Sequence, residues 1–276
     1  MRKLMLNIAL VLMGLGLLCS CETTIVQISD TQFGFYDENS LEYESATYTK
    51  CVNEVNELHP DAVVLTGDLV HNSDNEEQWK EFERITALID EDIPVFYIPG
   101  NHDVVKKETG LNMDDYYKHL DKSRFVGQVG DTYLIGIDTN PIKDFYGSEA
   151  EQEQFSWIED RLKENNGEYT PIIFTHHPFF LKNFDEEEGY FQLSVEARKK
   201  YFDLFERYGV KAVFSGHLHA NSVTSYKSYM PVVTTSAIGR QLGEDESGYR
   251  VITVRNGKVS HKYVDVLVNI DNQEDK

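Results

Sequence analysis

Six of the nine histidines in this 276-residue chain lie in or beside short polar turns that also carry carboxylate and amide side chains. Five such turns contain Asp30; Asp68 with His71; Asn101 with His102 and Asp103; His176 with His177; and His217 with His219. Imidazole, carboxylate and amide groups are suitable ligands for metal ions such as Mn, Fe and Zn. One such turn is a weak signal, because Gly-Asp and Asn-His pairs occur in many loops. The ordered set of five indicates a metal centre.

Each of these turns follows a short apolar segment that is typical of a buried strand. The predicted strands span residues 25–29, 62–66, 95–98, 172–175 and 212–215. Ligand sites in open α/β sheets lie outside the carboxyl ends of the strands. We therefore expect six side chains to converge, namely those of Asp30, Asp68, Asn101, His176, His217 and His219.

Strands and helices alternate along the chain and must position these turns. Apolar residues at helical spacing predict helices over 45–59, 76–89, 149–163 and 194–208. Further strands are predicted over 133–137, 223–226, 232–235, 249–254 and 259–264. No linker and no internal repeat divides the series. The sequence therefore predicts one α/β domain over residues 21–268 and a polar tail over 269–276.

The composition excludes several classes of protein. Hydrophobic residues make up 41% and aromatic residues 12% of the chain, which is too many for a disordered protein. With 26 basic and 47 acidic side chains the net charge is −21, so the surface repels a phosphate backbone and no nucleic acid partner is expected. The same charge opposes anionic substrates, so phosphate chemistry would need its own local positive charge. Three cysteines exclude a disulfide scaffold.

Residues 1–20 are predicted to be a signal peptide of the lipoprotein type. Arg2 and Lys3 precede an apolar run over residues 4–18, which is shorter than the ~20 residues of a membrane-spanning helix. Residues 18–21, Leu-Cys-Ser-Cys, resemble a bacterial lipobox. Cleavage before Cys21 and lipidation of its thiol would export the protein and anchor it at a membrane of the bacterial cell envelope. The alternatives are an ordinary cleaved signal and an uncleaved anchor.

The ordered set of turns resembles the signature of one metalloenzyme family. Its five motifs are matched by Asp30-x-Gln32, Gly67-Asp68, Gly100-Asn101-His102-Asp103, His176-His177-Pro178 and Gly216-His217-Leu218-His219. From residue 30 to residue 219 the chain thus resembles the calcineurin-like metallophosphoesterases. Within that superfamily, the strings at 30–34, 67–71 and 236–243 look like the "complete" serine/threonine phosphatases with a calcineurin-like phosphoesterase domain.

The resemblance implies a four-layer α/β/β/α sandwich, in which two mixed β-sheets are flanked by helices. It also implies two divalent or trivalent metal ions at the strand ends. Transferred residue by residue, the ligands are Asp30, Asp68 and His219 for the first ion and Asp68, Asn101, His176 and His217 for the second. Asp68 would bridge the two ions. Ions roughly 3.5–4 Å apart can hold a hydroxide nucleophile and neutralise phosphoryl oxygens, which supplies the positive charge that the acidic surface lacks.

Gln32 departs from the family pattern, in which most members carry a histidine at this position. An amide oxygen is a weaker ligand than an imidazole nitrogen. His71 follows Asp68 by three residues, at the offset where purple acid phosphatases, which resemble this arrangement, carry a tyrosine ligand. The hypothesis is that Gln32, His71 or both complete the first metal site. The alternative is that His71 supports a ligand or lies in a surface loop.

His102 and Asp103 are predicted to be a proton-transfer pair. In the resembling family the histidine of this motif sits beside the leaving group, and a histidine oriented by a carboxylate can protonate a departing alkoxide. The alternative is that Asp103 only caps the following turn. His177 aligns with a position that is not a ligand in the family, so it is expected to support a ligand or to face the substrate.

Arg240 is the candidate for binding a substrate phosphate. A guanidinium group stays charged and binds phosphate oxygens through two hydrogen bonds. The alternative is a surface arginine that neutralises Glu244 or Asp245.

These features predict a binuclear metal-dependent phosphoric ester hydrolase. The first interpretation is a phosphomonoesterase that acts on small phosphate esters or phosphoproteins, with attack by a metal-bridging hydroxide and protonation of the leaving oxygen by His102. A phosphodiesterase is the first alternative, because the metal ligands would be shared and only the rim of the site would differ. The second is a non-catalytic envelope lipoprotein that binds metal or a phosphorylated ligand, which Gln32 alone supports.

Overall fold

The computed structural model describes residues 22–37, 39–108 and 110–268. The predicted signal peptide, Cys21 and the polar tail lie outside these described residues. Within them, no helix combines the length and the hydropathy that a membrane crossing requires.

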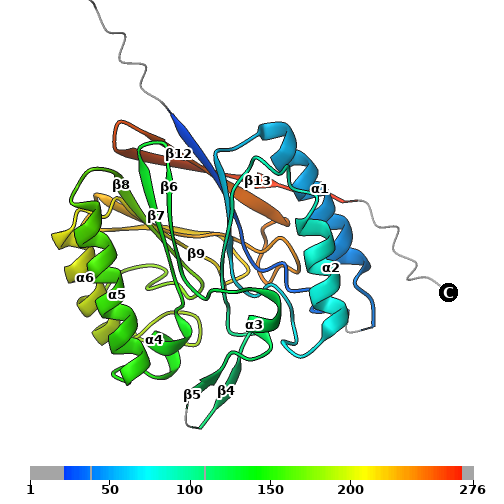
Figure 1. The fold of residues 1–276 in the computed structure, drawn as a ribbon, viewed down its shortest axis with the longest axis horizontal. Helices are drawn as coiled ribbons and strands as arrows, with labels where there is room; N and C mark the ends of the chain where they lie inside the picture. The colour runs from blue at the N-terminus through cyan, green and yellow to red at the C-terminus, as the bar shows by residue number, and fades with distance from the viewer. Residues whose placement is uncertain (1–21, 38, 109, 269–276) are drawn as a thin grey trace, which may run out of the picture.

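Two sheets form the centre of the fold (Figure 1). The first has the strand order β13-β12-β1-β2-β3 and consists of β1 (Thr23–Ile28), β2 (Ala62–Thr66), β3 (Val95–Ile98), β12 (Gly248–Arg255) and β13 (Lys258–Asp265). β1, β2 and β3 are parallel, and Ile25 pairs with Ala62 while Val63 pairs with Val95. The helices α1 (Glu42–Leu58) and α2 (Glu76–Thr86) connect these parallel strands. The carboxyl ends of β1, β2 and β3 therefore lie at the same edge of the sheet.

The second sheet has the order β10-β11-β9-β8-β7-β6. It consists of β6 (Phe125–Val129), β7 (Thr132–Ile137), β8 (Thr170–Thr175), β9 (Ala212–Ser215), β10 (Ser222–Tyr226) and β11 (Met230–Thr234). β7, β8, β9 and β11 are parallel, and the outer strands β6 and β10 are antiparallel to their neighbours. The connections contain α4 (Asn140–Asp144), α5 (Glu149–Asn165) and α6 (Val195–Arg207).

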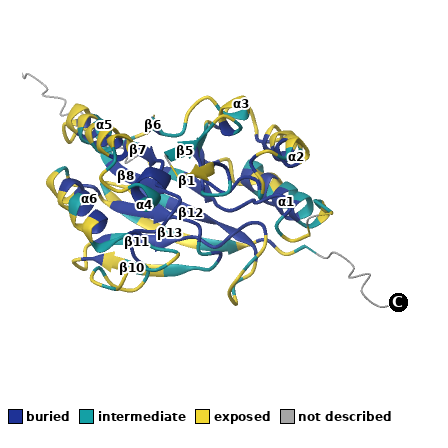
Figure 2. Cartoon of the chain, turned by 90° about the horizontal axis from the view of Figure 1, so that it is seen from below, coloured by how far each residue is buried: buried dark blue, intermediate teal, exposed yellow. Residues whose placement is uncertain are grey.

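The hydrophobic core has three parts that separate four layers. The first part lies between α1, α2 and the first sheet, with Tyr48 and Phe82 against Val63. The second lies between α5, α6 and the second sheet. The third lies between the two sheets and includes Val64 and Phe214. Neighbouring residues such as Val63 and Val64 thus serve different parts of the core, which explains why the parallel strands are apolar without alternation. Figure 2 shows the buried strands between helices with exposed outer faces. The predicted four-layer α/β/β/α sandwich is confirmed.

Some elements were not predicted from the sequence. They are β6, the hairpin formed by β4 (Val105–Lys107) and β5 (Gly110–Asn112), and the short helices α3 (Tyr116–His119) and α4. β6 contains Gly127, whose residue type argues against a strand interior. A Cβ at this position would lie 2.5 Å from the ring of Phe96, so the glycine lets the edges of the two sheets approach each other. β4 is exposed and β5 only half-buried, so burial imposes no apolar alternation there.

Candidate metal centre

Buried hydrogen bonds join the carboxyl ends of strands from both sheets. The side chain of Gln27 in β1 donates to the hydroxyl of Thr66 (3.1 Å) and to the carbonyl oxygen of Ser215 (3.0 Å). His176, directly after β8, contacts the carbonyl oxygen of Thr66 through Nδ1 at 2.8 Å. The turns after β1, β2, β8 and β9 are therefore held together at one end of the sandwich.

The backbone of these turns is in an unusual conformation. Five residues of the predicted site have positive φ, which non-glycine residues adopt only at a cost. They are Asp30 (54°), Gln32 (37°), Asp68 (48°), His217 (68°) and His219 (54°). Such residues persist where the surrounding structure holds them, and they concentrate at functional sites. The strain supports a functional role for the turns.

All six predicted ligands lie close together. The ligand atoms of Asp30, Asp68 and His176 lie within 4.8 Å of one another, and so do those of His176, His177 and His217. His219 Nε2 lies 3.4 Å from Asp30 Oδ1, and Asn101 Oδ1 lies 3.1 Å from His176 Nε2. His176 Nε2 also lies 3.3 Å from Asp68 Oδ2. The six side chains that the sequence singles out thus converge from both sheets.

Backbone carbonyl groups orient two of the imidazole rings. His176 directs Nδ1 to Thr66, and His219 directs Nδ1 to the carbonyl oxygen of Arg240 at 2.5 Å. A hydrogen bond of this kind fixes the tautomer and leaves Nε2 as the ligand atom. In both residues Nε2 is the nitrogen that faces a carboxylate of the site.

The arrangement fits metal ions because three of its buried polar atoms form no hydrogen bond within the protein. Of the seven buried side-chain atoms of the described residues that form no hydrogen bond, three belong to this site: Asp30 Oδ1, Gln32 Oε1 and His217 Nε2. A buried polar atom without a partner costs free energy, and such atoms are rare unless a ligand satisfies them. Carboxylate, amide and imidazole donors are a suitable set for Mn, Fe or Zn. These donor groups form two overlapping clusters and support two metal ions.

The carboxylates and imidazoles shift one another's pKa values strongly. Burial disfavours the protonated ring of His176, but the charge of Asp68 outweighs it and raises the pKa to about 9. Burial and the charge of His176 lower the pKa of His217 to about 3. Burial would raise the pKa of Asp68, but His176 holds it well below its usual range. The site therefore favours anionic carboxylates together with positive charge between them, which metal ions would supply.

Asp103 has a different role from the one predicted. Its carboxylate accepts backbone N–H groups of Leu69 (2.8 Å), Val70 (3.2 Å) and Gly100 (2.7 Å), so it joins the turn after β2 to the turn after β3. The expected pair with His102 is not formed. The ring of His102 instead contacts the carbonyl oxygen of His71 through Nδ1 at 2.9 Å.

Gln32 and His71 lie beside each other. Gln32 Nε2 is 3.4 Å from His71 Nδ1, and the side chain of Gln32 is buried. The ring of His71 stacks on that of His102 at 4.8 Å and lies 5.2 Å from that of Phe35. The two candidates for completing the first metal site thus contact each other, and His71 also supports the ring of His102.

Arg240 is exposed and lies over aromatic rings. Its guanidinium group is 5.4 Å from the ring centre of Phe35 and 5.9 Å from that of Tyr36. Asp245, one of the two acidic residues expected to neutralise it, instead accepts the backbone N–H of Asn221. The guanidinium group of Arg240 thus lies over Phe35, whose ring is 5.4 Å from that of His219, and the carbonyl group of Arg240 orients the ring of His219.

Gly100 allows the turns to approach each other closely. A Cβ on this residue would lie 2.1 Å from Asp68 Oδ1 and 2.2 Å from the backbone nitrogen of Asp68, which cannot move as a flexible side chain would. We expect Gly100→Ala to displace Asp68 and to lower metal affinity by roughly 10- to 100-fold, as displaced ligand supports do. Titration with Mn²⁺ of the metal-free protein measures this. Unchanged affinity in a variant with unchanged melting temperature would contradict it.

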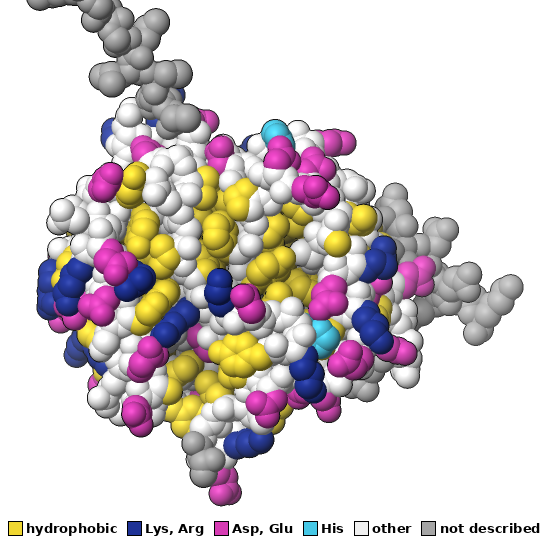
Figure 3. Space-filling view, viewed as in Figure 1, with side chains coloured by type: hydrophobic (Ala, Val, Ile, Leu, Met, Phe, Trp, Pro, Cys, Tyr) yellow, Lys and Arg dark blue, Asp and Glu magenta, His cyan; other side chains and the backbone are white. Residues whose placement is uncertain are grey.

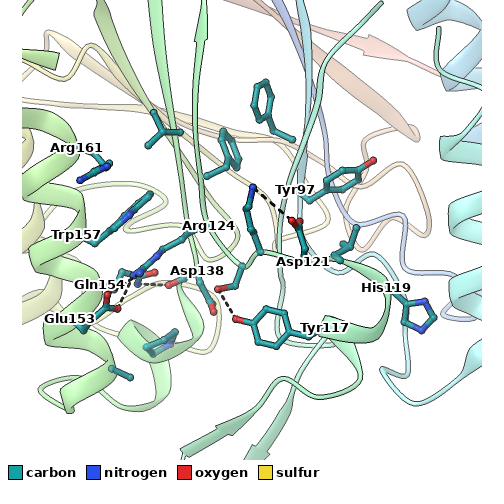
Figure 4. A pocket seen from close by; sticks show the side chains of 18 of the residues that line it. Tyr97, Tyr117, His119, Asp121, Arg124, Asp138, Glu153, Gln154, Trp157 and Arg161 are labelled. Carbon is teal, nitrogen blue, oxygen red and sulfur yellow. Dashed lines mark hydrogen bonds and ion pairs between the residues drawn. The ribbon is translucent and has the colours of Figure 1, made fainter. Parts of the chain in front are cut away.

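A separate cleft of about 960 Å³ lies between β3, β6 and α5 (Figure 4). Trp157 stacks on the guanidinium group of Arg124 at 4.6 Å, and Glu153 binds that group through two hydrogen bonds of 2.8 Å. Asp138 also lines the cleft, and burial raises its pKa to about 6. Figure 3 shows hydrophobic side chains gathered along the middle of this face, between the two pairs of helices. None of the candidate metal ligands is among the described residues that line the cleft.

Comparisons with known proteins agree with this geometry. The profile of a family described as calcineurin-like phosphoesterase matches residues 23–221. A protein of Rattus norvegicus named serine/threonine-protein phosphatase CPPED1 is 33% identical over 257 residues, which cover 86% of this chain and 82% of the rat protein. A protein of Arcobacter nitrofigilis named as a probable glycerophosphodiester phosphodiesterase is 29% identical over 231 residues, 80% of either protein.

The fold is also found in solved structures. A purple acid phosphatase from yellow lupin seeds has a TM-score of 0.67 over 88% of this chain and 52% of the lupin chain, at 17% identity. At this identity the similarity concerns the fold alone. The match to the family profile spans all five motifs, from Asp30 to His219.

Proposed function

Because the chain belongs to the calcineurin-like phosphoesterase family, we propose that this phosphatase hydrolyses phosphate monoesters at a two-metal centre formed by the converging turns. The observation that carries the proposal is the convergence of Asp30, Asp68 and His176 with three further ligands, which leaves buried ligand atoms without a hydrogen bond. When bound, two metal ions lower the pKa of water to generate a nucleophile and stabilise charge on the phosphoryl oxygens.

Each residue then has a defined task. The first ion would be held by Asp30, Asp68 and His219, and the second by Asp68, Asn101, His176 and His217. The orienting carbonyl groups of Thr66 and Arg240 keep two of these rings in place. Mn, Fe and Zn all suit this donor set, and we propose that one of them is present in each position.

His102 is the proposed proton donor to the leaving oxygen. Its ring is half-buried, and the contact of Nδ1 with the carbonyl oxygen of His71 leaves Nε2 available to the substrate. Asp103 supports it indirectly by holding the adjoining turns. Arg240 would bind a phosphate oxygen through its exposed guanidinium group.

Gln32 Oε1 is proposed as the atom that completes the first site, since it is buried without a partner while His71 lies against the amide nitrogen. Gln32→Ala is expected to lower the metal content from two ions to one per chain. His71→Phe, which keeps the ring contacts with His102 and Phe35, should retain both ions. Elemental analysis of the purified variants measures the content. Two ions in Gln32→Ala together with one in His71→Phe would reverse the assignment.

A phosphodiesterase is the second candidate, supported by the similarity to the Arcobacter protein. The test compares kcat/KM for phenyl phosphate and diphenyl phosphate, with a phosphoserine peptide as a third substrate because of the name of the rat relative. We expect the monoester to be hydrolysed faster than the diester. Hydrolysis of the diester alone would overturn the monoesterase, and one bound ion without turnover of any ester would favour a non-catalytic binding protein.

We also propose that the protein is exported and attached to a membrane of the bacterial cell envelope through lipidated Cys21. Arg2, Lys3 and the apolar residues 4–18 support this proposal. Because β1 begins at Thr23, the domain would lie close to the membrane surface. Mass spectrometry should find a lipid on Cys21, and Cys21→Ser should move the protein from the membrane fraction to the soluble fraction. A lipid-free Cys21 in the membrane fraction would contradict the anchor.

A further inference from the structure

An exposed aromatic side chain lies over one of the proposed metal ligands. The ring centre of Tyr190 is 5.4 Å from that of His217, and the ring centre of the neighbouring Phe191 is 5.6 Å from it. Tyr190 is 69% exposed, the highest value among the exposed large hydrophobic side chains of the described residues. The exposed ring beside a proposed ligand offers an apolar surface, and a bound group that covers it would gain free energy by excluding water.

The loop that carries Tyr190 is held firmly despite the absence of regular structure in it. Lys143 Nζ in α4 donates to the carbonyl oxygens of Gly189 (2.6 Å) and Gln192 (2.8 Å), which flank Tyr190 and Phe191. These hydrogen bonds give the backbone on both sides of Tyr190 and Phe191 a defined position beside His217.

A buried arginine in α6 also holds the same loop through hydrogen bonds. Arg198 in α6 is fully buried and donates to the carbonyl oxygens of Phe184 (3.0 Å) and Glu186, before Tyr190, and of Leu193 (2.9 Å), after it. Four of its hydrogen bonds thus go to backbone oxygens. Burying a charged group costs free energy, and here the hydrogen bonds of that group hold the loop in one conformation.

A second aromatic group lies beside another part of the same centre. The ring of Phe35 is 5.4 Å from that of His219 and 5.2 Å from that of His71. Next to it, Tyr36 is 49% exposed and stacks on Tyr43 at 4.3 Å. Aromatic rings thus lie at both ends of the proposed ligand set, beside His217 and beside His219.

We propose that Tyr190 selects phosphate monoesters whose leaving group carries a neutral flat ring, by stacking on that ring while the phosphate lies at the metal centre. The proposal rests on the function proposed above and adds the class of substrate. Aromatic pairs prefer stacked or edge-to-face contacts, which a saturated ring of the same size cannot form as well. The net charge of −21 disfavours leaving groups that bring further negative charge.

The test compares kcat/KM for benzyl phosphate, cyclohexylmethyl phosphate and ethyl phosphate. Their leaving alcohols have similar basicity, so the ratio of the first two reports the ring contact rather than the ease of bond cleavage. We expect the wild type to prefer benzyl phosphate by roughly twofold to tenfold, the range that an aromatic contact provides. Tyr190→Leu should bring this ratio close to one, and Tyr190→Phe should retain it.

Two further variants test whether the preference for benzyl phosphate depends on the ring of Tyr190 and on the position of its loop. Tyr229→Leu alters another exposed tyrosine, on the turn between β10 and β11, and should leave all three rates unchanged. Lys143→Met should lower the ratio, because the loop loses its fixed position, while the hydrolysis of ethyl phosphate changes little. A ratio of one in the wild type, or an unchanged ratio in Tyr190→Leu, would overturn the inference. Absence of turnover of all three esters by the metal-loaded protein would instead overturn the proposed function, and the inference with it.

Discussion

Asp68→Asn is expected to remove metal from both positions and to lower kcat/KM for phenyl phosphate by roughly 10³-fold or more. The metal ions contribute several kcal/mol of transition-state stabilisation, and each 1.36 kcal/mol corresponds to a factor of ten. Asp68 is the one residue shared by both proposed ligand sets, and its Oδ2 lies 3.3 Å from His176. The asparagine keeps an oxygen for the backbone N–H of His102, which Asp68 accepts at 2.8 Å, so the variant should fold.

Elemental analysis and steady-state kinetics measure these effects, with the melting temperature as a check on folding. Asp74→Asn, an exposed aspartate in the turn before α2, is the matched control and should keep both ions and full activity. Two tightly bound ions in Asp68→Asn would show that this carboxylate does not bridge them. The two-metal arrangement proposed here would then be incorrect.

His102→Ala is expected to have an effect that depends on the leaving group. For an alkyl ester such as ethyl phosphate, kcat should fall by roughly 10²- to 10⁴-fold, because an alkoxide needs a proton as it departs. For p-nitrophenyl phosphate the loss should be less than about tenfold, because this leaving group is stable as an anion. The metal content should stay at two ions, since Nδ1 of His102 contacts the carbonyl oxygen of His71 and the ring is not among the proposed ligands.

The control for His102 is His59→Asn. His59 follows α1 at φ 51°, a conformation that asparagine tolerates, and its side chain is exposed. It should retain the activity of the wild type on both esters. An equal loss on the alkyl and the aryl ester in His102→Ala would show that His102 positions the substrate or a metal ligand rather than donating a proton. Loss of metal in that variant would indicate a structural role.

The residues of the site could be found from the sequence because their signals are local. β2, β8 and β9 are buried on both faces, so they stand out as continuous apolar runs, and a polar turn follows each of them. The parallel arrangement of these strands then places the turns at one end of the sheets. The type of each residue and its distance from the end of a strand were sufficient to single out Asp30, Asp68, Asn101, His176, His217 and His219.

The contacts made by each side chain depended on the path of loops that join distant segments. Asp30 accepts the backbone N–H of His217, 187 residues away, and no local pattern encodes that distance. Neighbours in the sequence suggested that Asp103 orients His102, but backbone N–H groups from two turns compete for that carboxylate and bind it.

The position of Tyr190 also could not be predicted from the sequence. A tyrosine in an irregular segment resembles a core residue as much as a binding residue, and only the folded loop places its ring over His217. Residue chemistry and strand periodicity are properties of short segments, whereas hydrogen-bond partners and exposure are properties of the packed chain. The candidate ligands of the metal centre can therefore be predicted from the amino-acid sequence. The hydrogen-bond partners of Asp30 and Asp103 and the position of Tyr190 beside His217 are decided by the tertiary structure.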